Sequence, residues 1–446
     1  MTATISPAAV ASESRTTRSV FEEARRYIPG GTSRIHYYYD PYPIYGRTAS
    51  GCRLTDVEGV ERTDFLNNMT SLIHGHADPL INQAIIEQLE RGSAWSEPSE
   101  AEIELARLMV ERVDTVEQIR FSNSGTEAVM LAIKLARAFT GRDKIAKFEG
   151  FYHGYYDYAQ VSFNSTPTNW GPDDSPASVA SSGGLADSVT GDVLVAPYND
   201  RATVERLLDA HGSEIAAFIT DPLANRAGFP MPAEGFPEFL REITRDYGIP
   251  LIFDEVISFR VAYDGAQGKY GGEPDLTTFG KIIGGGLPIG AVGGRAEIMS
   301  LLDPTDGPPK VLSGGTFSAN PLTMVAGLAS MRQMTPDVYD RLDALGRRVR
   351  NESNAILANA GEPAQVTGDG SVFRIMMTAG PIVDYRSSVR GASPPERFAA
   401  LHKSLLDEGV IVSKDGLGCL STPMGEAEID GFLGALERSV AGLPAL

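Results

Sequence analysis

The sequence predicts an α/β fold in which helices cover both faces of a parallel or mixed sheet. Two observations favour this fold class. From about residue 79 onward, amphipathic helical patterns alternate with short apolar segments. These apolar segments are nearly continuous, as in strands that are buried on both faces. The chain has 446 residues, of which 42% are apolar, and this length allows about two to three domains with large cores.

The N-terminal part of the chain is less regular. Residues 1–17 are rich in Ala, Ser and Thr and lack the apolar core of a secretory signal, so we expect a loose tail. A helix is expected over 18–27, and the Pro-Gly-Gly of residues 29–31 ends it. Residues 34–45 hold five Tyr and two Pro, which predicts an irregular segment, either a packed loop or the wall of an aromatic pocket. Residues 51–65 predict a hairpin.

The rest of the chain predicts the sheet and its covering helices. Residues 165–191 are polar and rich in Ser, Pro, Gly and Asp, and a loop of this length is usually either functional or disordered. After residue 326 the pattern becomes mainly helical. Helices are expected at 80–91, 100–113, 126–139, 201–210, 236–246 and 338–358, and strands at 119–121, 144–149, 192–196, 215–220, 251–256, 372–378 and 410–413.

Composition argues against several classes of function. The chain has 39 basic and 58 acidic residues, a net charge of −19, so nucleic acid and anionic membranes are not expected partners. No apolar run reaches the roughly 18 residues of a membrane span. The two cysteines, Cys52 and Cys419, form no CxxC pair, which favours a reducing, cytoplasmic setting. His74 and His76 are accompanied by no cysteine or helical HExxH pattern, so no metal site is predicted.

A phosphate-sized anion site is predicted at the start of the helix over 126–139. The preceding residues, Phe-Ser-Asn-Ser-Gly-Thr-Glu at 121–127, lead from a strand through a Ser/Gly turn into the helix. Ser124 and Glu127 fit a capping box. Free N–H groups at a helix N-terminus attract anions, and the hydroxyl groups of Ser124 and Thr126 add donors. The alternative is an ordinary capped helix.

Two acids, Asp254 and Glu255, interrupt the otherwise apolar strand over 251–256. A carboxylate in a sheet core is costly unless it meets a cation or strong hydrogen-bond donors. Sheets of this kind bind ligands at the carboxyl ends of their strands, where these acids lie. The alternative is an exposed strand end with solvated acids.

Lys281 is the lysine best placed for chemistry. Only eight of the basic residues are lysines, and lysine forms Schiff bases with carbonyl compounds. Lys281 is followed by three glycines at 284–286, which permit positive φ and a close approach of backbone to a ligand. None of the other lysines has such a neighbourhood. Lys134 lies on a helix and Lys269 in a Gly-rich loop, and the surroundings of Lys144, Lys147, Lys310, Lys403 and Lys414 are typical of the surface.

These three elements together match pyridoxal phosphate (PLP). The helix N-terminus would hold the phosphate and the lysine would form the imine. An acid would keep the pyridine nitrogen protonated, so that the ring acts as an electron sink. Two other phosphate sites are disfavoured, because the chain has no GxxxxGK[ST] sequence of a P-loop and no GxGxxG after an early strand.

The same segments resemble the class III aminotransferases, which are fold type I PLP enzymes, and in particular the branch of glutamate-1-semialdehyde 2,1-aminomutase and its aminotransferase relatives. The resemblance implies a large domain with a mostly parallel seven-stranded sheet and a smaller α+β domain. It divides the chain into a flexible tail at 1–17, an N-terminal part of the small domain at 18–78, the large PLP-binding domain at 79–325 and the C-terminal small domain at 326–446. The matching stretches are SNSGTEA (122–128), FYHG (151–154), FDEV (253–256), FGKIIGGGLPIGAVGGR (279–295) and GGTFSANPLTM (314–324).

The resemblance also implies roles for individual residues around the cofactor ring. Lys281 would form the Schiff base and move protons during the reaction. Asp254 would bind the pyridinium nitrogen. Tyr152, with His153 beside it, would stack on one face of the ring, and Val256 would pack on the other.

The resemblance assigns a second group of residues to the phosphate. Ser124, Gly125 and Thr126 would hold it within one subunit. Thr316 would reach the phosphate of the cofactor in the neighbouring subunit. The resemblance therefore implies a homodimer with active sites at the interface.

The substrate side departs from the aminomutase pattern. Mutases carry a longer segment after Pro-Gly-Gly, whereas residues 29–34 here read Pro-Gly-Gly-Thr-Ser-Arg. Relatives that act on β-amino acids have a similar Ser-Arg, so we expect Arg34 to bind a substrate carboxylate; the alternative is an arginine packed on the Tyr-rich segment. Asp221 stands where the mutases have Glu, and the segment after Asp254 is one residue shorter. Asp415 falls where aryl β-amino-acid aminotransferases place an Arg.

We therefore expect a PLP-dependent aminotransferase that moves an amino group between a carboxylate-bearing amine or amino acid and a keto acid. A β-amino acid, or a donor with a bulky or aromatic group, would suit a pocket lined by Tyr37, Tyr38, Tyr39 and Tyr42. The alternatives are a glutamate-1-semialdehyde-type 2,1-aminomutase and a racemase of the same fold. A non-catalytic PLP fold is a further alternative, which the retained Lys281 disfavours.

Overall fold

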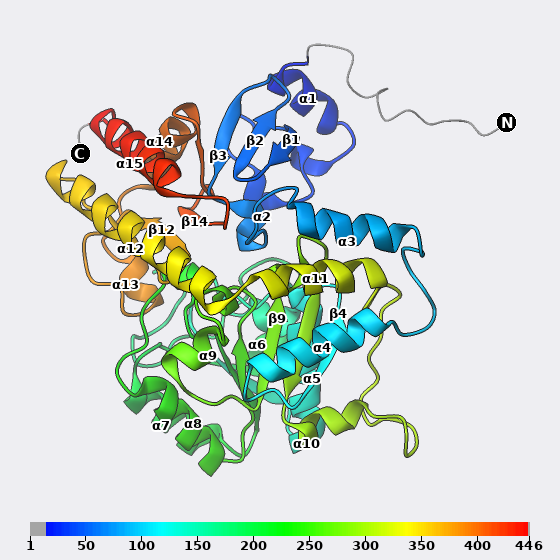
Figure 1. The fold of residues 1–446 in the computed structure, drawn as a ribbon. Helices are drawn as coiled ribbons and strands as arrows, with labels where there is room; N and C mark the ends of the chain where they lie inside the picture. Colours follow the sequence, from blue (N-terminus) through cyan, green and yellow to red (C-terminus); the bar gives the residue numbers. More distant parts are fainter. Residues whose placement is uncertain (1–14, 445–446) are drawn as a thin grey trace.

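A seven-stranded sheet lies at the centre of the protein, whose computed structural model describes residues 15–444 (Figure 1). In order of pairing, its strands are β4 (Gln118–Ser122), β10 (Gly290–Gly294), β9 (Leu276–Gly280), β8 (Leu251–Asp254), β7 (Ile215–Thr220), β5 (Lys144–Phe148) and β6 (Val193–Ala196). β10 runs antiparallel to β4 and β9, and all other neighbouring strands are parallel. The predicted mostly parallel seven-stranded sheet is therefore confirmed.

Two of the seven strands, β9 and β10, have no counterpart among the strands predicted from the sequence. Three of the five residues of β10 are glycines, and glycine weakens strand propensity. The structure gives the reason for the glycines. A Cβ atom at Gly290 would lie 1.9 Å from the backbone oxygen of Ser124, and one at Gly294 would lie 2.2 Å from that of Asp275. β10 thus depends on close backbone contacts that local sequence patterns do not reveal.

Helices cover both faces of the large sheet. Alternate strand residues point to opposite faces, so Ile145 and Ile252 pack under α5, whereas Ala146 and Phe253 pack with α7 and α8. α4 and α11 cover the remaining part of the side opposite α5, where they share a core with the C-terminal helices. The covering helices are α4 (Glu100–Arg112), α5 (Gly125–Thr140), α7 (Arg201–His211), α8 (Phe236–Asp246) and α11 (Pro321–Gln333). α3 (Pro79–Leu89) packs on α11, and α9 (Gly265–Tyr270) packs on the turn after β8.

The two ends of the chain meet in a smaller part of the molecule, beside the large sheet (Figure 1). A four-stranded sheet has the order β1 (Gly46–Ser50), β2 (Arg53–Asp56), β3 (Glu61–Asp64) and β13 (Val410–Ile411). Val410 of β13 pairs in parallel with Thr63 of β3, so the predicted hairpin at 51–65 is joined by a strand from the C-terminal segment. A three-stranded sheet consists of β11 (Gln365–Thr367), β12 (Val372–Met376) and β14 (Leu417–Cys419). The exact domain boundaries stay a prediction.

The remaining elements are divided between the two parts of the molecule. α1 spans Thr17–Ala24, shorter than the helix expected over 18–27, and residues 1–14 of the expected tail lie outside the described residues. The polar segment 165–191 follows a largely irregular path that ends in α6 (Asp187–Gly191), yet it packs on the protein and buries Trp170. The C-terminal helices are α12 (Pro336–Asn359), α13 (Tyr385–Val389), α14 (Pro395–Asp407) and α15 (Glu426–Ala441).

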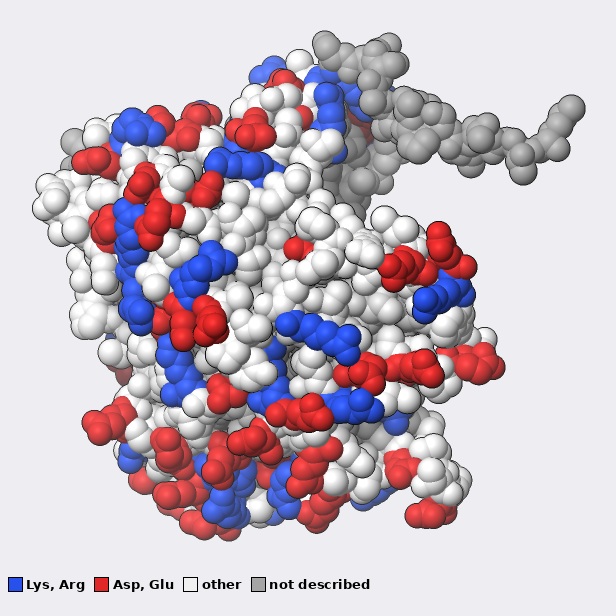
Figure 2. Space-filling model, viewed as in Figure 1, with Lys and Arg blue, Asp and Glu red and all other residues white. Residues whose placement is uncertain are grey.

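The surface carries charges of both signs. Figure 2 shows acidic and basic side chains interspersed over one face of the molecule. Surface ion pairs add little to stability, so the apolar cores hold the fold. Over residues 15–444, no helix is both long and apolar enough to cross a membrane. The same stretch of chain contains no group of three or more His, Cys, Asp or Glu side chains placed to hold a metal ion.

Candidate active site

A cavity of about 400 Å³ lies at the edge of the large sheet where the parallel strands end. It collects residues from the start of α5, the segment after β5, the end of β8, the segment after β9 and the N-terminal part of the chain. Of the predicted site residues, the cavity is lined by Arg34, Ser124, Gly125, Thr126, Tyr152, His153, Asp254, Val256 and Lys281. Thr316 is the one predicted site residue that does not line it. The structure thus brings together segments that are far apart in the sequence, and their individual roles stay predictions.

The start of α5 opens into this cavity. Ser124 is the N-cap, and its hydroxyl accepts a hydrogen bond from the backbone N–H of Glu127 at 3.2 Å. The carboxylate of Glu127 accepts from the N–H of Asn123 at 2.6 Å, one residue earlier than in the expected capping box. The first N–H groups of a helix have no partner inside the helix, so those of Gly125 and Thr126 are available to an anion.

Gly125 must be a glycine for a steric reason. A Cβ atom there would lie 2.9 Å from a methyl group of Val256, closer than real side chains approach. The backbone of α5 can therefore lie directly against Val256, which forms part of the cavity wall.

Asp254 is a buried carboxylate with three hydrogen-bond donors. Its side chain accepts from Nδ1 of His153 at 2.8 Å, from the hydroxyl of Thr278 at 2.9 Å and from the N–H of Val256 at 3.2 Å. Such donors stabilise the charged form of a carboxylate. The alternative of a solvated strand end is wrong, because only 5% of Asp254 is exposed.

His153 contacts Asp254 directly, which sequence reasoning did not foresee. Burial lowers the pKa of His153, although the hydrogen bond to Asp254 acts in the opposite direction. Its other ring nitrogen, Nε2, is buried and has no hydrogen-bond partner among residues 15–444. His153 therefore orients the acid at the end of β8, while its second ring nitrogen stays buried and unpaired among the described residues.

The second acid, Glu255, faces away from the cavity. Its carboxylate accepts from the N–H groups of Ala266 and Gln267 and from the Gln267 side chain, at 2.6, 3.0 and 2.8 Å. Burial raises the pKa of Glu255 to about 7. Because successive residues of a strand point to opposite faces, only Asp254 is available to a ligand.

Lys281 follows β9 and is the one lysine among the residues that line the cavity. Burial lowers the pKa of its amine to about 8, while the carboxylates of Asp254 and Asp221 act in the opposite direction. An amine with this pKa is partly uncharged near neutral pH, which a nucleophile or base requires.

The glycines at 284–286 mainly allow close packing within the protein. A Cβ atom at Gly285 would lie 2.3 Å from the backbone oxygen of Ala326, on α11, and one at Gly284 would lie 2.6 Å from Ile289. Of the three glycines at 284–286, only Gly286 lines the cavity. Gly285 therefore lets the turn that carries Lys281 pack against α11, and Gly284 lets it pack against Ile289.

Lys147 contradicts the expectation of a surface lysine. It is fully buried, and its amine donates to the backbone oxygens of Phe151 and Val161 at 2.8 and 2.7 Å. Burial lowers its pKa to about 7. No pattern in the sequence signals this burial, because the two carbonyl partners come from the segment after β5.

Asp221 is a cavity residue that sequence reasoning noted only as a departure from the mutase pattern. It follows β7, is buried and accepts from the N–H of Leu223 at 3.0 Å. Burial raises its pKa to about 8, and the neighbouring Asp254 adds to this effect. The sequence could have predicted this position. Asp221 directly follows a predicted strand, and the carboxyl ends of adjacent parallel strands meet at one edge of the sheet.

Arg34 lies between this cavity and a second one of about 550 Å³. Its guanidinium donates to the side-chain oxygen of Asn68 at 3.0 Å and lies 3.9 Å from the centre of the Tyr37 ring. The two sequence interpretations of Arg34 are therefore compatible, since it packs on the Tyr-rich segment and also faces both cavities. The second cavity is lined mainly by apolar and aromatic side chains, among them Tyr37, Tyr39, Tyr45, Leu54, Leu72 and Ile411.

Thr316 and Asp415 lie outside both cavities. Thr316 is exposed, in a segment where Leu312 and Phe317 are also 73% and 59% exposed. Asp415 contacts Arg226 at 3.1 Å and Arg374 at 2.9 Å, and these arginines hold the pKa of its carboxyl below the usual range despite its burial.

The residues of the first cavity fit PLP. The helix N-terminus suits a phosphate, and Lys281 supplies an amine. Oδ2 of Asp254 accepts only from His153 and so keeps a lone pair for a further donor. His153 has an unpaired buried nitrogen beside this acid. This fold and this site define a PLP-dependent enzyme of fold type I.

Comparison with known proteins identifies the family. Residues 36–424 match the family "Aminotransferase class-III", and the chain belongs to it. PLP is the cofactor of this family, and solved relatives bind it, so the predicted cofactor is confirmed.

The relatives of the chain differ in the reaction that their names describe. It is 40% identical to glutamate-1-semialdehyde 2,1-aminomutase 2 of Geobacillus kaustophilus, over 96% of this chain and 98% of the relative. It is 50% identical to an omega-transaminase from Sphaerobacter thermophilus, with a TM-score of 0.93 over 95% of this chain and 97% of that one. A β-phenylalanine aminotransferase from Variovorax paradoxus is 35% identical, with a TM-score of 0.85 over 96% and 94% of the two chains.

Proposed function

We propose that the chain is an aminotransferase that moves an amino group between a carboxylate-bearing amine or amino acid and a keto acid. The observation that carries this proposal is the position of Arg34, which faces the cavity of Lys281 and has a neutral amide, Asn68, as its side-chain hydrogen-bond partner. A guanidinium without an acidic partner in a cavity suits a substrate carboxylate. The likeness to the omega-transaminase and the β-phenylalanine aminotransferase supports the same reaction class.

The cofactor supplies an electron sink when bound, and the residues of this chain would hold it as the resemblance implies. Ser124, Gly125 and Thr126 would bind its phosphate. Tyr152 and Val256 would contact its ring.

Asp254 would keep the pyridine nitrogen protonated, with His153 orienting the carboxylate. The amine of Lys281 would attach the cofactor and would take and return a proton at the reacting carbon of the substrate. Its lowered pKa supports this role, because an ammonium group accepts no proton.

The second cavity supports a donor with a bulky or aromatic group. It adjoins the first cavity at Arg34, Asn68 and Gly286, which line both. Its walls are largely apolar, and burial of an apolar substituent there would add binding free energy. A carboxylate at Arg34 and an apolar group beyond it would together fix the orientation of the substrate.

We also propose a homodimer. Leu312 and Phe317 are large apolar side chains that flank Thr316 and are exposed in this chain, and neighbouring exposed apolar residues are typical of interaction surfaces. In such a dimer Thr316 would reach the phosphate of the partner's cofactor. Light scattering of the purified enzyme tests the dimer, and a monomer at micromolar concentration would contradict it.

An intramolecular aminomutase is the second candidate, because curated relatives such as the Geobacillus enzyme bear that name. A racemase of the same fold is a further alternative function. The departures at residues 29–34 and at Asp221 argue against the mutase.

A panel of amino donors and keto acids separates these reactions. A transaminase stops after a single turnover when no keto acid is present, whereas a mutase or racemase continues with one substrate alone. Sustained turnover of a single substrate without a keto acid would contradict the aminotransferase proposal. The substrates tested should include β-amino acids with aromatic and with small substituents.

A further inference from the structure

The segment that carries Tyr152 and His153 is tied to the C-terminal part of the chain by a buried ion pair. Arg386 lies on α13, and Glu149 directly follows β5. Nε of Arg386 contacts one carboxylate oxygen of Glu149 at 2.6 Å, and Nη2 donates to the other at 3.3 Å. Only 3% of the Arg386 side chain and 2% of the Glu149 side chain are exposed. The pair therefore joins two parts of the sequence more than 200 residues apart, within the protein interior.

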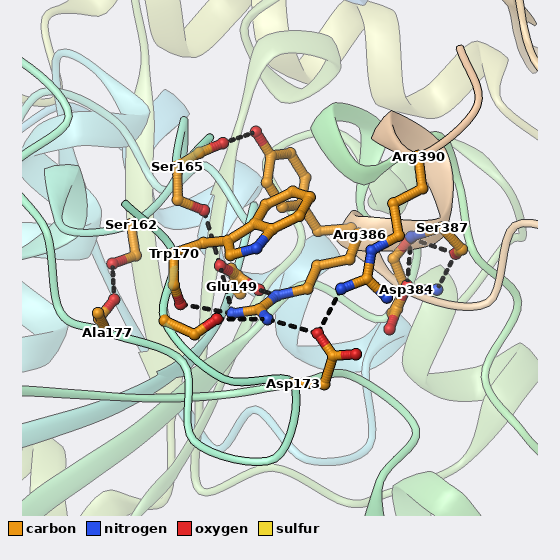
Figure 3. A network of polar contacts seen from close by, with 12 residues as sticks. Glu149, Ser162, Ser165, Trp170, Asp173, Ala177, Asp384, Arg386, Ser387 and Arg390 are labelled. Carbon is orange, nitrogen blue, oxygen red and sulfur yellow. Dashed lines mark hydrogen bonds and ion pairs between the residues drawn. The ribbon is translucent and has the colours of Figure 1, made fainter. Parts of the chain in front are cut away.

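The guanidinium of Arg386 also holds the irregular segment 165–191. It donates to the backbone oxygens of Trp170 at 2.5 Å and Gly171 at 3.0 Å, and it contacts the carboxylate of Asp173 at 2.8 Å. It lies 4.8 Å from the centre of the Trp170 ring. Figure 3 shows the guanidinium between Glu149, Asp173 and the indole of Trp170. Arginine suits this position because its planar group directs several donors at fixed angles.

The neighbouring Tyr385 strengthens this connection. Its hydroxyl donates to the backbone oxygen of Ser165 at 2.7 Å, and the hydroxyl of Ser165 donates to Glu149 at 2.7 Å. The ring of Tyr385 packs on Gly150, where a Cβ atom would lie 2.1 Å from it. Gly150 also has a φ of 77°, which favours glycine. The chain path between Glu149 and Tyr152 is thus set by contacts with α13.

Lys147 also holds the segment that carries Tyr152. The buried amine of Lys147 binds the backbone oxygens of Phe151 and Val161, so the loop that carries Tyr152 is closed at its base. Tyr152 then packs edge-on against Phe163, with ring centres 5.4 Å apart. Lys147 fixes where the loop begins and ends, and the contacts of Glu149 fix its direction.

We propose that Arg386 is a positioning residue for the cofactor site, which acts through Glu149 and the following turn to hold Tyr152 and His153 in the cavity. The C-terminal part of the chain thereby contributes to cofactor retention without touching the cofactor. This inference rests on the proposed function, because it takes Tyr152 to contact the cofactor.

The test measures the release of PLP from the holoenzyme, together with its visible absorbance and the thermal unfolding temperature. Arg386→Met is expected to speed release about tenfold or more, because hydrogen bonds to charged groups are among the stronger ones in proteins. Arg390→Met is the matched control. Arg390 contacts the same Asp173 and lies 5.3 Å from the centre of the Trp170 ring, but no hydrogen bond or ion pair joins it to Glu149. The control should release PLP at the rate of the unchanged enzyme.

A double variant separates positioning from simple destabilisation. Arg386→Met leaves the carboxylate of Glu149 buried without its partner, which destabilises the fold by itself. Glu149→Gln combined with Arg386→Met removes that charge, so the unfolding temperature should recover while the fast release of PLP persists. If both return to the values of the unchanged enzyme, Arg386 has only a structural role and the proposal is overturned. If Arg386→Met alone does not fold, PLP release can still be measured on the double variant.

A double-mutant cycle with Tyr152→Ala tests the route of the effect. If Arg386 acts through Tyr152, adding Arg386→Met to Tyr152→Ala should leave the release rate nearly unchanged. A full additional effect would overturn the proposal. If Tyr152→Ala alone does not alter release, the assignment of Tyr152 to the cofactor is wrong, and both statements fail together. If Tyr152→Ala speeds release but Arg386→Met does not, only the positioning role fails.

Discussion

The two cavities of this protein are built in different ways. The cavity of Lys281 lies at the edge of one sheet, where parallel strands end and α5 begins, so short local sequences supply most of its polar groups. The second cavity lies where the Tyr-rich N-terminal segment meets residues 402–414 of the C-terminal part. It owes its shape to chain segments that come together only in the folded protein. We infer that the first cavity carries the chemistry common to the family and that the second carries substrate preference.

The sharpest test of this division is the removal of the lysine. Lys281→Ala should lower turnover by at least about a thousandfold, because the amine would serve as both nucleophile and base. It should also abolish the visible absorbance that depends on the lysine. Lys403→Ala is the control, since Lys403 is exposed and pairs with Asp407 on the surface of α14. Retained turnover in Lys281→Ala would refute the assignment of the site.

Substitution of Arg34, which lines both cavities, should affect activity less and only for some substrates. Arg34→Met should raise KM about 10- to 100-fold for a donor with a carboxylate, as expected for the loss of hydrogen bonds between charged groups. A donor amine that lacks a carboxylate serves as the internal control, and its KM should not change. An equal loss for both donors would mean that Arg34 supports the fold of the Tyr-rich segment instead of binding substrate.

Filling the second cavity should change preference more than rate. Leu54→Phe, in the wall of that cavity, should lower kcat/KM for a bulky donor about tenfold relative to a small one, as changes of apolar pocket size do. Val60→Phe lies on the same hairpin but is exposed, so it should leave the ratio unchanged. Equal effects on both donors would show that substrates do not enter the second cavity.

The pH dependence of protein stability should reveal the buried acid Asp221 in the first cavity. The pKa of Asp221 rises from 3.8 to about 8 in the folded protein, so between these values the folded state binds more protons than the unfolded state and stability falls as pH rises. Asp221→Asn lacks this titration and should gain stability relative to the unchanged protein over that range, by up to about 1.4 kcal/mol per pH unit. Urea unfolding at several pH values measures the difference. A difference that does not vary with pH would contradict the buried, protonated acid.

Much of the first cavity could be predicted because its parts are local. The helix start at 124–127, the acid that ends β8 and Lys281 beside its glycines each carry a recognisable pattern within a few residues. Strand ends of a parallel sheet converge, so these patterns could be assigned to one site before the structure was known.

The features that could not be predicted from local sequence patterns depend on residues that are distant in the sequence. The glycines of β10 form a strand because adjacent backbone leaves no room for side chains. The burial of Lys147 requires two carbonyl groups from a later turn, and the contact of His153 with Asp254 requires the pairing of strands.

The sequence by itself determined the fold class, the family, the cofactor and the lysine most suited to bind it, because each follows from short motifs in a particular order. Only the tertiary structure decided which of two adjacent acids faces the ligand, how Arg34 joins two cavities and how Arg386 reaches the segment of Tyr152. These features depend on side-chain direction and on contacts between remote segments, which hydrophobic periodicity and motif spacing do not encode.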